Sequence, residues 1–422
     1  MTHTFLEKMN AETLDDQTTN RLHSRILELS EIGRTEDQGS KRMGYSDKEL
    51  AAKEKIKSWM EAIGMSVRTD GAGNVFGRYK GHDDSEVFMA GSHVDSVPNG
   101  GHFDGVTGVL SALEIAELWH AENYTPAYSY EVVIFSDEEG SRFNSGLTGS
   151  RAFMGLIGEE ELDKYRDPDN KTIDDVLEHI GSDRTEFLKA EGPDYNIKMY
   201  GEIHIEQARQ LKEKALPVGI VSGIAGATRT NITFKGEAGH AGSTPMHQRK
   251  DALVQASEFV RTLPDIPPSI SQTAVATVGK LKVIPNGVNV IPGEVQLVVD
   301  ARDINEDHQA ELIQAVQQHA EKVAGQSEVT VDIDLTTRIT PIPIGEDVIG
   351  KMEEAFRRNN QVPVHLPSGA GHDAMSVGTK HPITMLFVRS IKGISHNPEE
   401  FSHISDIRDA VLILKDFFEQ YE

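Results

Sequence analysis

Apolar runs alternate with a loop and a helix between residues 87 and 135, and this alternation constrains the fold more than any other feature of the chain. Residues 87–91 and 130–135 are apolar runs of strand length, and residues 109–119 between them have the pattern of a helix. Apolar strands joined through a helix are typical of crossovers between parallel strands whose two faces are both covered. The sequence therefore predicts an α/β fold, with a mixed sheet that has helices on both faces.

A second pattern begins near Leu216 and Pro217. We expect strands and helices there in the order β-α-β-β-α-β, at residues 230–234, 251–263, 274–278, 295–301, 310–323 and 329–335. This order is typical of a small α+β domain of the ferredoxin-like kind. The predicted organisation is one domain of residues 1–216 and 331–422, interrupted by a smaller domain of residues 217–330.

Composition excludes several classes of partner and chemistry. The 42 Lys and Arg residues against 67 Asp and Glu residues give a net charge of −25, which disfavours nucleic acid and anionic membranes as partners. The chain has no cysteine, so disulfides, cysteine nucleophiles and thiolate metal sites are all excluded. No run approaches the roughly 20 apolar residues of a membrane span, and the first residues lack the apolar core of a signal peptide. We expect a cytoplasmic protein.

Histidines and carboxylates follow the predicted strands at the points where those strands end. The residues of this kind are His93, Asp95, Asp104, the run Asp137-Glu138-Glu139, His204 and His396. In an open α/β sheet, ligands bind beyond the carboxyl ends of the strands. Three successive carboxylates repel one another unless a cation offsets them or one of them stays protonated.

Each of these features has an ordinary explanation when it is taken singly. A lone histidine such as His204 is more often a hydrogen-bonded core residue, and an acidic run before a glycine is more often a solvated turn. Taken together, and without cysteine, they predict a metal site of histidine and carboxylate ligands, which suit Zn²⁺, Mn²⁺, Co²⁺ or Ni²⁺. The sequence has no HExxH helix, phosphate-binding P-loop or G-x-S-x-G elbow that would support another chemistry.

Eight motifs in order carry a resemblance to a known family: GSHVDSV, NGGHFDGVTGV, FSDEEGSRF, HIEQ, GEAGHAGSTPM, PNGVNVIPG, SGAGHDAM and GISHNPEEF. They resemble the dinuclear metallohydrolases of the aminoacylase and carboxypeptidase clan, and within it the N-carbamoyl-L-amino-acid hydrolases and allantoate amidohydrolases. The resemblance implies that residues 1–216 and 331–422 form a catalytic domain with two divalent metal ions. It also implies that residues 217–330 form a lid through which two chains make a homodimer.

The resemblance implies a set of metal ligands and catalytic groups. His93 and His204 match the ligands of one ion, Glu139 and His396 match those of the other, and Asp104 matches the bridge between them. Glu138 matches the general base, and Asp95 matches the carboxylate that orients His93. A bridging carboxylate offers one oxygen to each of two cations roughly 3.5–4 Å apart. Asp137 has no role that we can derive, and we expect His102 not to be a ligand.

The resemblance also implies substrate-binding residues. His240 matches the histidine that polarises the scissile carbonyl group, and Asn289 and Arg302 match binders of the substrate carboxylate. A guanidinium group suits a carboxylate because it can donate two parallel hydrogen bonds, although an arginine at a strand end is more often in a surface ion pair. Gln207 matches a residue near the carbamoyl group, and Gly369 and Gly371 could offer backbone N–H groups.

The implied activity is hydrolysis of a linear C–N bond other than a peptide bond in a small ureido acid. We expect an N-carbamoyl-L-amino acid to give the L-amino acid, CO₂ and NH₃, and allantoate is the alternative substrate. Allantoate amidohydrolases commonly carry an arginine pair after Ile-Ala-Gly, and here Thr228 takes the first of those positions beside Arg229. A different class, a non-catalytic metal-binding scaffold, is disfavoured because the base and all five ligand positions are filled.

Overall fold

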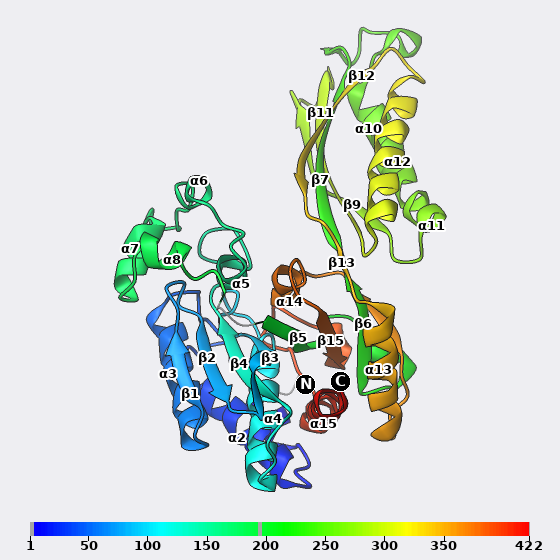
Figure 1. Ribbon diagram of the computed structural model, residues 1–422. Helices are drawn as coiled ribbons and strands as arrows, with labels where there is room; N and C mark the ends of the chain where they lie inside the picture. The colour runs from blue at the N-terminus through cyan, green and yellow to red at the C-terminus, as the bar shows by residue number, and fades with distance from the viewer. Residues whose placement is uncertain (1–3, 193–195, 422) are drawn as a thin grey trace. The chain divides into compact units, whose positions relative to one another are not determined.

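The chain folds into two compact units in the computed structural model, which describes residues 4–192 and 196–421 (Figure 1). The first unit contains the chain up to Ser222, Ile344–Leu366 and the chain from His372 onward. The second unit contains Gly223–Pro343 and Pro367–Gly371. The predicted return at residue 331 lies inside β12 (Thr330–Arg338), because that strand pairs with β7 (Gly226–Lys235) in the second unit.

A mixed sheet forms the centre of the first unit. Its strands, in spatial order, are β1 (Ser66–Thr69), β2 (Val75–Tyr79), β4 (Tyr128–Phe135), β3 (Asp83–His93), β5 (Asn196–Ile205), β15 (Ile383–Val388) and β6 (Val218–Ile224), with β14 (His365–Ser368) and β13 (Ile342–Pro343) paired to β6. β4, β3, β5 and β15 run parallel to one another, and β1, β2 and β6 are antiparallel to their neighbours. The predicted α/β class is confirmed.

Helices cover both faces of this sheet. The helices of the first unit are α1 (Phe5–Asn10), α2 (Gln17–Ser30), α3 (Asp47–Ala62), α4 (Val106–Glu122), α5 (Thr148–Phe153), α6 (Glu159–Leu162), α7 (Ile173–His179), α8 (Arg184–Leu188), α9 (Gln210–Lys214), α13 (Glu346–Arg358), α14 (Asp373–Val377) and α15 (Ile404–Gln420). Successive side chains of a strand point to opposite faces. In β5, Gly201 lies against Leu414 and Phe418 of α15, whereas the Glu202 carboxylate accepts the backbone N–H of Ala374 in α14.

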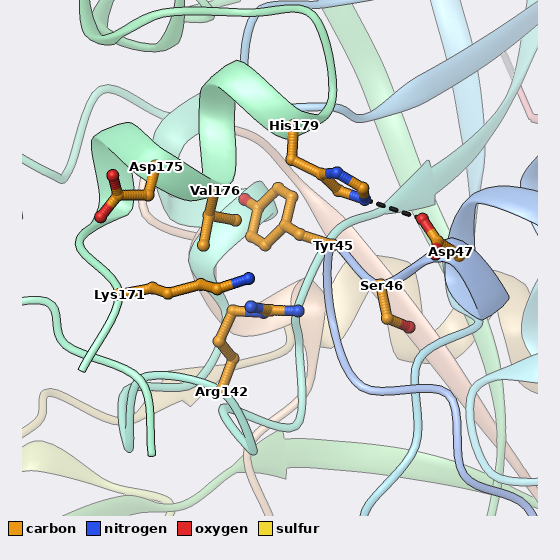
Figure 2. Close-up of a pocket in the computed structure, with 8 residues that line it drawn as sticks. All are labelled: Tyr45, Ser46, Asp47, Arg142, Lys171, Asp175, Val176 and His179. Atoms are coloured by element: carbon orange, nitrogen blue, oxygen red, sulfur yellow. Dashed lines mark hydrogen bonds and ion pairs between the residues drawn. The ribbon is translucent and has the colours of Figure 1, made fainter. Parts of the chain in front are cut away.

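A smaller apolar cluster supports the segment between β4 and β5. The sequence of this segment is polar, and its helices α5 to α8 are short. They bury a separate set of side chains that includes Tyr45, Phe143, Tyr165, Ile173 and Phe187. Tyr45 precedes α3, which begins after the Ser46 cap, so this cluster joins the N-terminal region to the segment after β4 (Figure 2).

The second unit has the predicted β-α-β-β-α-β order. Its main elements are β7, α10 (Ala252–Thr262), β9 (Val275–Ile284), β11 (Glu294–Asp303), α12 (Glu306–Ala324) and β12, with a short pair β8 (Gly239–His240) and β10 (Val290–Ile291) and two further turns of helix, η2 (Leu263–Asp265) and α11 (Pro267–Ile270). The antiparallel sheet has the order β12-β7-β11-β9, and α10 and α12 pack on it around Phe234, Phe259 and Leu312. Among the described helices of either unit, none is long and apolar enough to cross a membrane.

Candidate metal centre

The five predicted ligands converge within the first unit. His93 ends β3, His204 lies near the end of β5, and Glu139 follows β4. These three strands are parallel, so their carboxyl ends meet at one edge of the sheet. Asp104 comes from the loop before α4, and His396 from the segment after β15.

One group of three possible ligands consists of His93, Asp104 and His204, all of them buried. The Nε2 atoms of His93 and His204 lie 3.6 and 3.1 Å from Asp104 Oδ1. The Nδ1 atom of His93 is 3.1 Å from the carbonyl oxygen of Asp95, and that of His204 is 3.0 Å from the carbonyl oxygen of Ile205. Because a carbonyl oxygen only accepts, each Nδ1 donates, which leaves each Nε2 as the ring atom that faces Asp104.

A second group consists of Asp104, Glu139 and His396. His396 Nε2 lies 3.5 Å from Asp104 Oδ2 and 3.3 Å from Glu139 Oε2. Asp104 thus offers Oδ1 to one group and Oδ2 to the other, which is the arrangement of a bridging carboxylate. The buried His93 Nε2 has no hydrogen-bond partner among the described residues, as expected of an atom that binds a cation. The donor atoms therefore fit divalent metal ions.

The acidic run after β4 is buried, and its electrostatics are those of a site that needs cations. Burial raises the pKa values of Asp137 and Glu138 well above their usual range, and burial and the neighbouring Asp104 raise the pKa of Glu139 to about 8. Burial opposes ionisation of Asp104 too, but His204 and His93 outweigh it and hold the pKa of this carboxyl well below its usual range. Divalent cations at these ligands would replace the protons that the crowded carboxyls otherwise retain.

Asp95 holds both His93 and the acidic run. Its Oδ1 and Oδ2 atoms accept the backbone N–H groups of Glu138 and Glu139, each at 3.1 Å, and Oδ1 is 3.5 Å from His93 Nδ1. Glu138 belongs to neither ligand group, yet its Oε2 lies 3.5 Å from His93 Nε2. The carboxylate of Glu138 is thus beside the ligands without being one of them. Asp137 instead accepts a hydrogen bond from Thr148, and His102 Nε2 donates to the carbonyl oxygen of Gln38.

Residues that the sequence reasoning missed hold Asp104 in place. Glu400 Oε1 accepts the backbone N–H groups of Phe103 and Asp104 at 2.9 and 3.0 Å, and Ser395 donates to Asp104 Oδ2 at 2.7 Å. Glu400 is 1% exposed, whereas its neighbour Glu399 is only partly buried, with 43% of its side chain exposed. Both glutamates stand in the GISHNPEEF motif, but nothing in that pattern distinguishes the buried one from the partly buried one.

We expect Glu400→Ala to lower the free energy of unfolding by about 1–3 kcal/mol, because it leaves two buried N–H groups without an acceptor. Urea denaturation of the two proteins measures the difference. The matched control is Glu399→Ala, which removes a partly exposed carboxylate and should change stability by no more than about 0.5 kcal/mol. Equal stability of the two variants would contradict the role of Glu400.

Gln207 lies beside the bridging position. Its Nε2 donates to Asp104 Oδ2 at 2.9 Å and to Ser395 Oγ at 3.2 Å. The side chain predicted to contact the carbamoyl group is therefore held against the same carboxylate that joins the two ligand groups.

The remaining predicted residues belong to the second unit, where they form two local groups. His240 and Asn289 lie together, because β8 pairs with β10 and the N–H of Ala241 donates to the Asn289 carbonyl at 3.0 Å. The exposed His240 accepts the Gly242 N–H at Nδ1, so its proton is on Nε2 and can be donated outward.

Arg302 and Gly369 form the other local group. Arg302 donates from Nη1 to the Gly369 carbonyl at 2.7 Å, and from Nε and Nη2 to the two oxygens of Asp300 at 2.7 and 3.1 Å. An added Cβ at Gly369 or Gly371 would meet nothing within 4 Å, so the backbone is open at both positions. The sequence did not single out Asp300, whose role in orienting Arg302 becomes visible only on the paired strand.

Comparison with known sequences finds relatives along nearly the whole chain. The profile of peptidase family M20/M25/M40 matches residues 89–420. The chain is 38% identical to the N-carbamoyl-L-amino acid amidohydrolase of Geobacillus stearothermophilus over 387 residues, which cover 92% of this chain and 94% of that protein. It is 32% identical to the allantoate amidohydrolase of Escherichia coli over 387 residues, with the same two coverages of 92% and 94%.

Comparison with solved structures gives a concordant result. An amidase of the hydantoinase/carbamoylase family from Burkholderia multivorans superimposes with a TM-score of 0.87 at 32% identity. The match covers 95% of this chain and 97% of that one. The resemblance carried by the eight motifs is confirmed at the level of the family.

Proposed function

The chain belongs to peptidase family M20/M25/M40, and on that premise we propose that it is a metal-dependent amidohydrolase that converts an N-carbamoyl-L-amino acid to the L-amino acid, CO₂ and NH₃. The observation that carries the proposal is the pair of ligand groups that share Asp104. His93 and His204 would hold one divalent ion, Glu139 and His396 the other, and Asp104 both. Such ions supply Lewis acidity and a bound water of lowered pKa.

Glu138 is the general base in this proposal. It lies beside the ligands without belonging to either group, so its carboxylate is available to take a proton from the attacking water and pass it to the leaving nitrogen. Asp95 positions this base through the backbone N–H of Glu138 and, at the same time, fixes the tautomer of His93. One water is consumed for each molecule of L-amino acid, CO₂ and NH₃ released.

The second unit supplies the substrate-binding groups in this proposal. The Nε2 proton of His240 is available to stabilise negative charge on the carbonyl oxygen, which is typically worth about 3–4 kcal/mol. Arg302, with Asn289 and the open backbone at Gly369 and Gly371, would bind the substrate carboxylate.

Thr228 favours the N-carbamoyl-amino-acid reading over allantoate. Thr228 is 1% exposed, and its hydroxyl donates to the Ala301 carbonyl at 2.9 Å. This hydroxyl is therefore hydrogen-bonded inside the sheet and does not take the place of an arginine that binds substrate. Arg229 keeps allantoate as the second candidate: it is paired with Asp300 across the strands, and it therefore shares a sheet face with Arg302.

Ammonia release tests both the activity and the substrate. The purified chain would be assayed with a panel of N-carbamoyl-L-amino acids, their D-enantiomers and allantoate, each with added Mn²⁺, Co²⁺, Ni²⁺ or Zn²⁺. We expect release from the L-series in the presence of metal. Release from allantoate alone would establish the second candidate, and no release from any substrate would contradict the proposed function.

Arg302→Ala should raise KM by about ten- to a hundredfold, because a charge-assisted hydrogen bond to the substrate carboxylate contributes about 1.5–3 kcal/mol. Arg302→Lys keeps the charge but loses the planar pair of donors, so it should also be impaired. Steady-state kinetics measure both effects. Arg261→Ala is the matched control, since Arg261 is exposed on the same unit and pairs with Glu258. An unchanged kcat/KM in Arg302→Ala would place the carboxylate elsewhere.

We further propose that two chains form a homodimer through the second unit. Its sheet has two edge strands, β9 and β12, and these carry the exposed apolar residues Val275, Leu281 and Leu335. Unpaired edges with apolar side chains are usually covered, and a two-fold pairing would cover them. We expect light scattering at micromolar concentration to give twice the 46.5 kDa chain mass. A mass of one chain would refute the dimer.

A further inference from the structure

The tripeptide Pro-Asn-Gly occurs twice in the chain, at residues 98–100 in the first unit and at residues 285–287 in the second. Both asparagines have a positive φ, 58° at Asn99 and 60° at Asn286. The two copies are therefore matched in the asparagine, in both of its neighbours and in this backbone angle. A difference in reactivity between them reports the contacts that the fold gives to each.

An asparagine that precedes a glycine can modify itself. The backbone nitrogen of the glycine attacks the side-chain carbon Cγ, a C–N bond forms, and the amide nitrogen leaves as ammonia, which gives a five-membered succinimide ring. Water then opens the ring at one of its two carbonyl carbons, and the product is aspartate or, when the original main-chain bond is the one that breaks, isoaspartate. One water is consumed and one ammonia is released. Glycine favours the reaction because it has no side chain to hinder the attacking nitrogen and its backbone turns freely.

Hydrogen bonds restrain both reacting groups at Asn99. Thr35 Oγ1 donates to Asn99 Oδ1 at 2.6 Å, and Asn99 Nδ2 donates to Asp37 Oδ2 at 3.3 Å. The attacking nitrogen of this copy belongs to Gly100, which is buried and donates its N–H to the Ser40 carbonyl at 2.9 Å. These bonds must break before the nitrogen can reach the side-chain carbon.

Asn286 has none of these restraints. Over residues 4–192 and 196–421, neither its side-chain amide nor the N–H of Gly287 has a hydrogen-bond partner. Residues 285–289 are all exposed, so water reaches the reacting groups. The carbonyl of Gly287 accepts the N–H of Val290 at 3.2 Å, which closes a turn after the reacting bond without holding the nitrogen or the amide.

We propose that Asn286 is a site of spontaneous deamidation in the folded protein, and that the hydrogen bonds of Asn99 protect the other copy. Both products replace a neutral amide by a carboxylate at an exposed position. Isoaspartate also adds one carbon to the main chain of the loop between β9 and β10.

The position of Asn286 gives the modification a consequence. Asn289 follows three residues later, its carbonyl accepts the Ala241 N–H at 3.0 Å, and Val290 pairs with His240 between β10 and β8. A longer main chain displaces this loop, and a new carboxylate repels an anionic ligand beside it. The consequence for turnover rests on the proposed function, in which His240 and Asn289 contact the substrate, but the modification itself does not.

The test is peptide mapping by mass spectrometry while the full chain is incubated in a warm, mildly alkaline buffer. The conversion of amide to acid is followed separately at the two copies, and isoaspartyl peptides are resolved by their retention. We expect Asn286 to convert about tenfold or more faster than Asn99, because the hydrogen bonds at Asn99 must be broken first. In guanidinium chloride that unfolds the chain, the two copies should convert at similar rates, since the matched tripeptides then lack these contacts.

Variants at Asn286 measure the consequence for the substrate. Asn286→Gln keeps the amide but would have to close a six-membered ring, which is slower, so its KM for an N-carbamoyl-L-amino acid should stay constant during incubation while that of the unchanged chain rises. Asn286→Asp carries the charge from the start, and its KM should be raised by about two- to fivefold, the size of an interaction between exposed charges.

Two results would overturn the proposal. One is an intact amide at Asn286 in the folded chain under conditions that convert a synthetic peptide of residues 284–289. The other is equal conversion of Asn286 and Asn99 in the folded chain. An unchanged KM in Asn286→Asp would overturn the effect on the substrate. The mass measurement needs neither metal nor substrate, so its failure leaves the proposed amidohydrolase function untouched, and an inactive chain that converts at Asn286 would contradict only that function.

Discussion

Glu138→Gln should lower kcat by about 10²–10⁴-fold while the amount of bound metal stays the same. The glutamate carboxylate lies 3.5 Å from His93 Nε2 but belongs to neither ligand group, so its loss removes proton transfer and leaves the ligands in place. Glutamine has the same shape and cannot take up a proton. Steady-state kinetics and elemental analysis of the dialysed protein measure the two quantities.

Glu139→Gln is the matched control for this variant. It makes the same chemical change at the next residue, but Glu139 is a member of the group with Asp104 and His396, so we expect metal content to fall together with turnover. A near-normal kcat in Glu138→Gln would place the base elsewhere, with Asp137 the next residue to test. If the unchanged chain were inactive and Glu138→Gln indistinguishable from it, the non-catalytic scaffold would be the correct reading.

Asp104→Ala should have the largest effect on the metal content. Asp104 is the one residue that the two groups share, through Oδ1 in one and Oδ2 in the other, so its removal weakens both sites at once. We expect bound metal to drop to one ion per chain or fewer, and turnover to fall on the order of 10³-fold, since metal ions contribute several kcal/mol to transition-state stabilisation.

His102→Ala serves as the comparison for Asp104→Ala. His102 stands two residues earlier in the same glycine-rich loop, but its ring packs on Phe5 and bonds to the Gln38 carbonyl. Metal content should therefore be retained in this variant, even if stability decreases. Two metal ions per chain in Asp104→Ala would show that the carboxylate is not a bridge.

The element pattern of the first unit could be predicted from local sequence. The apolar runs at residues 87–91 and 130–135 lie within β3 and β4, because an apolar run between turn residues can satisfy its burial and its backbone hydrogen bonds only within a sheet. The ligands could be predicted for the same reason. Parallel strands bring their carboxyl ends to one edge, so His93, Glu139 and His204 converge once the strands are assigned.

Tertiary structure alone decided how these ligands are held. Glu400 accepts the N–H of Asp104 across 296 positions of sequence, and no local pattern distinguishes it from Glu399. In the same way, Asp300 orients Arg302 against Gly369. A local sequence determines which residues a strand buries. The distant polar group that accepts a hydrogen bond from a buried donor is determined by the packing of segments that are far apart in the sequence. The periodicity of the sequence does not predict that packing.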